Sequence, residues 1–158
     1  MHNGVNEFSM IEEIWHVITH GVGLVLSIAG LSILVAYATL QGSALVITSS
    51  AIFGTALIVL YGASTLYHAI THTGIKKIFQ QLDHASIYFL IAGTYTPVTL
   101  VSLGGAWGWM IFSIVWATAL VGVFLKFAYP QRFEKLSLVL YVLLGWLIVI
   151  ATQPLMEN

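Results

Sequence analysis

The sequence predicts an all-α fold, a polytopic bundle of transmembrane helices, from two observations. Hydrophobic residues make up 59% of the 158 residues and charged residues only 7%, whereas soluble domains contain about 25% charged residues. The apolar residues also gather in runs of the roughly 20 residues that an α-helix needs to cross a bilayer. With a mean hydropathy of +0.95, the chain is expected to be a multi-pass protein of a cell membrane.

Five apolar runs define the predicted spans, at about residues 14–40, 43–70, 84–103, 107–127 and 136–151. Turn or polar residues separate them: Gln41 with Gly42, a predicted polar loop over 71–82, Gly104 with Gly105, and a charged loop around Pro130. Pro97 predicts a kink late in the third run. The predicted domains are therefore an N-terminal segment 1–13, a transmembrane helical domain 14–151 and a short tail 152–158.

Small residues in the first two runs predict close contacts between helices, because apolar bulk gives helices no driving force for association in lipid. These are Gly21, Gly23, Ala29 and Gly30 in the first run, and Gly54, Gly62 and Ala63 in the second.

Charge and cysteine content exclude several functions. The formal net charge is −1 and there is no run of basic residues, so we expect no nucleic-acid partner. The expected partners are membrane lipids and further copies of the chain in a homo-oligomer. The chain has no cysteine, so a metal would be held by His, Asp, Glu or water.

A polar helix face carries the candidate site. Ser64, His68 and His72 follow one another at spacings of four in the stretch STLYHAITH, within about 80° of arc on an α-helix. Asp83 and His84 begin the third run, and His16 and His20 begin the first. Ionisable groups at membrane spans usually face a protein interior, a cavity or an ion. His68 is the strongest candidate because it lies inside an apolar run.

Each candidate also has a structural alternative. Asp83 is equally suited to cap the N-terminus of the third helix, and Ser64 to bond the carbonyl one turn back. His16 and His20 have a spacing that suits a metal but also recurs by chance. His72 is expected in a wet loop, and His84 to point elsewhere on its helix.

Three stretches together resemble a known family: EEIWHVITHGVG (12–23), STLYH (64–68) and LDHASIYFLIAGTYTP (82–97). In order and spacing they resemble the hemolysin III family, the bacterial branch of the progestin and adipoQ receptor (PAQR) superfamily. The resemblance runs from about residue 12 to the end, and it implies a protein of the bacterial inner membrane with seven helices and a cytoplasmic N-terminus.

The resemblance also implies a zinc site near the cytoplasmic face. His68 would be a zinc ligand with Ser64 one turn before it, and Asp83 would hold a zinc-bound water. The other ligands would be an H-x-x-x-H pair on a seventh helix. The five predicted spans do not include that helix, so we expect either a truncated chain or ligands from another copy, and weak or absent zinc in this chain alone.

Three functions remain open at this stage. By resemblance to the wider superfamily, the first is a zinc-dependent hydrolase acting on lipid amide or ester bonds at the cytoplasmic leaflet, with Asp83 as general base and Ser64 in support. The second is a non-catalytic sensor or a channel-like, cytolytic protein. The third treats the polar cluster as interhelical hydrogen bonding alone.

The distribution of cations predicts the topology. The five Lys and Arg residues all fall in or beside the second and fourth loops, so the positive-inside rule places these loops and the N-terminus in the cytoplasm. Five spans then place Asn158 outside the cytoplasm. Reporter fusions at Asn158 should be active only on the external side; activity confined to the cytoplasm would contradict this topology.

Overall fold

The structure is a computed structural model that describes residues 8–129 and 134–156. The described residues form helices and no strand, which confirms the predicted all-α class. The helices in chain order are α1 (Met10–Gln41), α2 (Ala44–Ala69), α3 (Thr73–Pro97), the π-helix η1 (Val98–Leu103), α4 (Gly105–Ala128) and α5 (Glu134–Met156).

Short polar signals define the ends of the first helices. Ser9 caps α1 in a capping box: its hydroxyl accepts from the backbone N–H of Glu12, and its own backbone N–H donates back to the Glu12 carboxylate. Gly42 ends α1 with a φ of 71°, a left-handed conformation that favours glycine. Ser43 then caps α2. The predicted turn at Gln41 and Gly42 is confirmed.

The predicted polar loop over residues 71–82 is wrong for most of its length, because α3 already begins at Thr73. Ile75, Ile78, Phe79 and Leu82 recur at i, i+3, i+4 and i+7, a spacing typical of one face of a helix. Lysines and glutamines lie between these apolar residues and lower the mean hydropathy of the segment, which is why it was predicted as a loop. They do not interrupt the helical spacing of the apolar residues.

The helical hydrogen bonding changes after Pro97, while the kink expected there stays a prediction. The proline ring removes a backbone donor, and the chain continues from α3 into the π-helix η1. At the end of η1 the N–H of Gly104 donates to the carbonyl of Thr99 over 2.9 Å. Gly104 and Gly105 have φ values of 61° and 55°, so the predicted glycine turn before α4 is confirmed.

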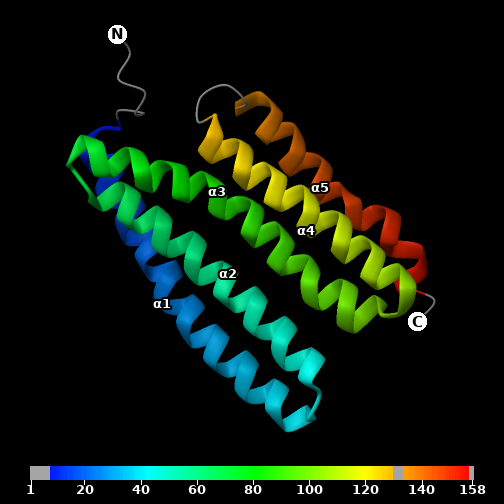
Figure 1. The fold of residues 1–158 in the computed structure, drawn as a ribbon. Coiled ribbons are helices and arrows are strands. Elements are labelled where there is room, and N and C mark those ends of the chain that lie inside the picture. The colour runs from blue at the N-terminus through cyan, green and yellow to red at the C-terminus, as the bar shows by residue number, and fades with distance from the viewer. Residues whose placement is uncertain (1–7, 130–133, 157–158) are drawn as a thin grey trace.

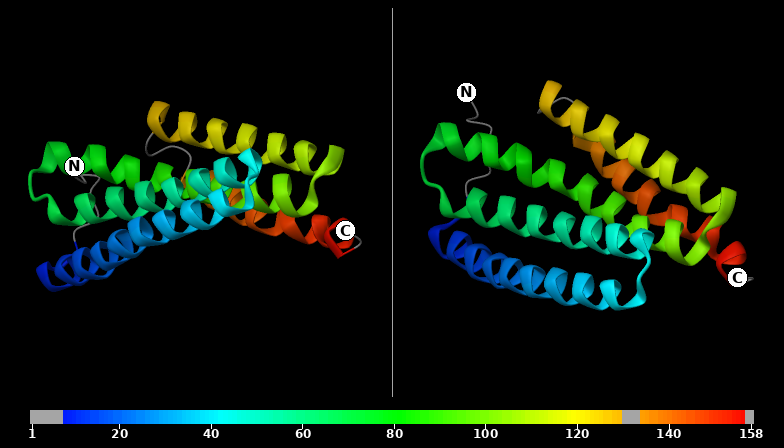
Figure 2. Two further views of the ribbon diagram at one scale, coloured as in Figure 1. Left: turned by 90° about the horizontal axis from the view of Figure 1, so that it is seen from below. Right: turned by 60° about the horizontal axis from the view of Figure 1, so that its bottom comes forward.

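Helix α3 lies between two helical pairs (Figure 1). The backbone of α1 packs along α2, and α2 packs along α3, while α4 and α5 lie on the other side of α3. Figure 2 shows the same order from below and with the bottom turned forward. Of the most apolar stretch within Thr73–Leu103, which comprises α3 and η1, half is buried inside the bundle. This share is larger than in α1, α2 or α4, because α3 lies in the centre.

The lipid-facing surfaces are apolar. Four helical segments are long and apolar enough to cross a membrane: Met10–Gln41, Ala44–Ala69, Thr73–Leu103 and Gly105–Ala128. In α5 the described apolar stretch is shorter, Lys135–Leu147, so the fifth span stays a prediction. Large exposed side chains on α1, such as Ile14, Val25 and Ile33, suit contact with lipid tails.

Two tyrosines attach α5 to the bundle. The hydroxyl of Tyr95 donates to the carbonyl of Leu144 over 2.7 Å, and the hydroxyl of Tyr141 donates to the carbonyl of His84 over 2.9 Å. Tyr95 and Leu144 belong to the buried core, together with Tyr88 and Val115. These bonds join α3 to α5 within the core and at its edge.

The predicted close helix contacts are confirmed at Gly23 and Gly54 and wrong at Gly30. A Cβ at Gly23 would lie 2.6 Å from the Tyr61 ring, and one at Gly54 would lie 2.6 Å from Leu31. At Gly30 nothing lies within 4 Å, and at Gly62 the nearest atom is 3.8 Å away. Gly30 therefore has no close neighbour, whereas a Cβ at Gly62 would make an ordinary van der Waals contact with Leu24 of α1.

At Gly93 α3 lies close against α2, which generates a prediction about packing. A Cβ there would lie 2.7 Å from the Cβ of Ala56, an atom fixed to its own backbone, so Gly93→Ala must push the helices apart. We expect a loss of about 1–3 kcal/mol in the free energy of unfolding. Gly62→Ala is the matched control, since it gains helix propensity of up to about 1 kcal/mol without a clash. Equal melting temperatures of the two variants in detergent would contradict this packing.

Candidate functional site

Three helix ends meet at one end of the bundle: the start of α1, the end of α2 and the start of α3 (Figure 1). Polar side chains from all three helices gather there. Glu13, His16 and His20 come from α1, Ser64 and His68 from α2, and Lys76 from α3. We call these six residues the histidine cluster.

Ser64 joins α2 to α1. It is buried, and its hydroxyl oxygen lies 2.6 Å from Nδ1 of His20. The direction of this hydrogen bond depends on which His20 nitrogen carries the proton. The sequence singled out Ser64 for its position one turn before His68, whereas the structure pairs it with the histidine of the neighbouring helix.

Glu13 joins all three helices. Its Oε2 lies 2.6 Å from Nδ1 of His68 on α2, and its Oε1 accepts a hydrogen bond of 2.6 Å from Nζ of Lys76 on α3. The three side chains are 18%, 7% and 12% exposed, respectively. Lys76 also lies over the Tyr67 ring, 5.2 Å from its centroid. Such shielded charges depend on each other, because breaking a buried pair leaves an uncompensated charge.

The three histidine rings of the cluster are close together. The rings of His16 and His68 stack with centroids 4.4 Å apart and planes 28° apart. His20 lies edge-on to both, at 6.1 Å from each. The set of imidazoles and one carboxylate is chemically suited to zinc.

The geometry does not make a complete metal site from these residues. A metal ion binds in the plane of an imidazole, and two nearly parallel planes this far apart cannot share one ion between them. Within residues 8–129 and 134–156, no group of three His, Cys, Asp or Glu side chains is placed to hold a metal ion. His68 fits zinc as one ligand, since metal-binding histidines usually have a carboxylate on the other ring nitrogen.

The other predicted residues are not among the six of the cluster. Asp83 lies in the interior of α3, so the helix-capping alternative is wrong, and its charge is close enough to act on His20 and Tyr67. His72 is exposed and stands at the N-cap of α3 without a side-chain cap bond. His84 is half-buried, and its carbonyl accepts from Tyr141.

The sequence interpretation missed Glu13 and Lys76. Glu13 was assigned to the N-terminal segment, and Lys76 was used only to orient the chain. A signal for Glu13 was present, because Glu13, His16 and His20 stand at i, i+3 and i+7 and so share one face of a helix. Nothing in the local sequence indicates that Lys76 reaches α1.

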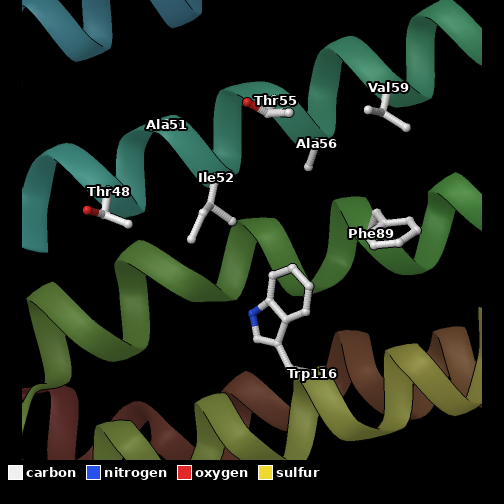
Figure 3. A pocket seen from close by; sticks show the side chains of 8 residues that line it. All are labelled: Thr48, Ala51, Ile52, Thr55, Ala56, Val59, Phe89 and Trp116. Atoms are coloured by element: carbon white, nitrogen blue, oxygen red, sulfur yellow. The ribbon is translucent and has the colours of Figure 1, made fainter.

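A separate apolar groove lies away from the cluster, between α2 and α4 with α3 beneath (Figure 3). Its volume is about 410 Å³, and Trp116 and Phe89 form one side. The indole N–H of Trp116 donates to Thr96 Oγ1 over 3.1 Å, which fixes the ring across the groove. None of the side chains that line the groove is ionisable. The lining residues are Thr48, Ala51, Ile52, Thr55, Ala56, Val59, Phe89 and Trp116.

The fold and the histidine cluster define a class: a polytopic helical membrane protein with a polar, histidine-rich site at one end of the bundle. A family model described as "Haemolysin-III related" matches residues 8–158. The chain therefore belongs to the haemolysin-III related family, as its motifs predicted.

Curated relatives agree with this assignment. The chain is 44% identical to "Hemolysin-3" of Bacillus cereus over 93% of this chain and 67% of the relative. It is 47% identical to "Hemolysin-3 homolog" of Bacillus subtilis over 94% of this chain and 70% of the relative. The human "Monocyte to macrophage differentiation factor" is 28% identical over 60% of this chain and 42% of its own length. No solved structure matches the chain significantly.

The pairing of Ser64 with His20 generates a prediction. Ser64→Ala leaves Nδ1 of His20 without its partner at a shielded position, which should cost about 1–3 kcal/mol in the free energy of unfolding. Ser32→Ala is the control, because Ser32 is exposed and donates to the carbonyl of Ile28 in its own helix. Thermal unfolding in detergent should separate the two variants; a Ser64→Ala protein as stable as Ser32→Ala would contradict the pairing.

Proposed function

We propose that this chain supplies part of a zinc-dependent site that hydrolyses lipid amide or ester bonds at the cytoplasmic leaflet. The observation that carries the proposal is the contact of 2.6 Å between Nδ1 of His68 and the Glu13 carboxylate. A carboxylate behind a histidine is the usual support of a metal-binding imidazole. The position of the cluster at the end of apolar helices also suits a substrate held in a membrane.

His68, Asp83 and Ser64 would have different roles in this site. His68 would hold the ion through Nε2, and Asp83 would orient the attacking water and accept its proton. Ser64 would support the site by holding His20 rather than act as a nucleophile. Zinc, when bound, lowers the pKa of a bound water to about 7. The remaining ligands would come from the H-x-x-x-H helix that the family resemblance implies.

Metal analysis and a hydrolysis assay test the proposal together. The purified chain should hold little zinc, and a version extended by an H-x-x-x-H helix should hold one ion and release fatty acid from lipid amides or esters in liposomes. His68→Ala should abolish both properties in the extended protein, whereas His72→Ala, an exposed position, should keep them.

Two outcomes would contradict the proposal. Tight, equimolar zinc in the unextended chain, lost in His68→Ala, would show that the cluster is a complete site by itself. An extended, zinc-loaded protein that cleaves none of the lipids would argue against a hydrolase.

The names of the two Bacillus relatives, which refer to hemolysin, favour a second candidate, a membrane-permeabilising protein. On this proposal the histidine cluster only holds α1, α2 and α3 together. Dye or ion release from liposomes without any lipid hydrolysis, unchanged in His68→Gln, would support it over the hydrolase.

A further inference from the structure

The His68 ring is restrained on several sides. Nδ1 lies 2.6 Å from Oε2 of Glu13, and His16 stacks on the ring with centroids 4.4 Å apart. The Tyr67 ring lies against the His68 ring, with the two centroids 4.6 Å apart and the ring planes 50° apart. The side chain is 7% exposed. Once Nδ1 is occupied by Glu13, Nε2 is the ring atom left to bind a ligand.

The second oxygen of Glu13 decides what the carboxylate can do for His68. Oε1 accepts from Nζ of Lys76 over 2.6 Å, so Lys76 already supplies a positive charge beside the carboxylate. An ionised carboxylate can only accept hydrogen bonds. The contact with His68 therefore requires the proton on Nδ1, and a neutral imidazole with that proton carries its lone pair on Nε2.

We infer that Glu13 is the positioning residue of the site: with Lys76 it fixes the Nδ1–H tautomer of His68 and so presents the Nε2 lone pair to a ligand. This inference deepens the proposed function and rests on it for the identity of the ligand, a metal ion. The tautomer itself is a property of the metal-free chain, so it can be measured whether or not the hydrolase proposal holds.

Nitrogen NMR of the histidine side chains tests the inference directly. In ¹⁵N-histidine-labelled protein in detergent with a chelator at neutral pH, His68 should show a protonated Nδ1 and an unprotonated Nε2. Its signals are assigned by their loss in His68→Gln. A wild-type His68 with the proton on Nε2, or on both nitrogens, would overturn the inference without any further variant.

Glu13→Gln should change the tautomer for a definite reason. The charged Nζ of Lys76 needs an acceptor, and the amide oxygen of glutamine supplies it. The amide NH₂ then faces Nδ1 of His68, which must accept rather than donate. We expect the proton of His68 to move to Nε2 in most molecules.

Glu12→Gln is the matched control. Glu12 is the neighbouring carboxylate, and its bonds are to Ser9 at the start of α1. The Glu12→Gln substitution should leave the His68 tautomer unchanged. Helical circular dichroism shows that each variant has folded; a folded Glu13→Gln protein with an unchanged Nδ1–H tautomer would refute the positioning role, and the hydrolase proposal would still stand on its own test.

Discussion

One carboxylate shared by a histidine and a lysine ties three helices together. Glu13 on α1 contacts His68 on α2 and Lys76 on α3, each at 2.6 Å. In a chain this apolar, polar side chains near the membrane are costly unless they satisfy each other. The contact therefore fixes how the ends of α1, α2 and α3 meet, and this arrangement in turn brings His16, His20 and Ser64 beside His68.

The rest of the bundle is held by close packing and by hydroxyl groups. Glycines let α3 approach its neighbours. Gly93 of α3 lies against Ala56 of α2, and the ring of Tyr88 of α3 lies so close to Gly122 of α4 that a Cβ there would clash with it. Lipid tails are as apolar as leucine, so such contacts, rather than hydrophobic burial, drive helix association in membranes. The histidine cluster thus sits at the end of a scaffold whose described buried polar side chains are mostly hydroxyls, among them Ser49, Ser86, Thr96 and Thr99.

Composition and local signals predicted the fold class, the glycine turns and the polar face with Ser64 and His68. These features depend on residues close together in the sequence. The partners across helices were not predicted, because they depend on the rotation of each helix about its axis. Ser64 was associated with His68 for this reason, although it bonds His20. Glu13 was overlooked because it precedes the first apolar run, although it shares a helix face with His16 and His20. The start of α3 was misplaced because a charged stretch was treated as a loop.

A double-mutant cycle between Glu13 and His68 tests most directly whether this contact joins α1 to α2. The free energies of unfolding of Glu13→Ala, His68→Ala and the double variant would be measured in detergent against the wild type. The structure predicts a favourable coupling of about 1–2 kcal/mol, above the average of about 0.6 kcal/mol for hydrogen bonds between membrane helices. Effects that add within about 0.3–0.5 kcal/mol, as for independent sites, would contradict the central role given to this contact.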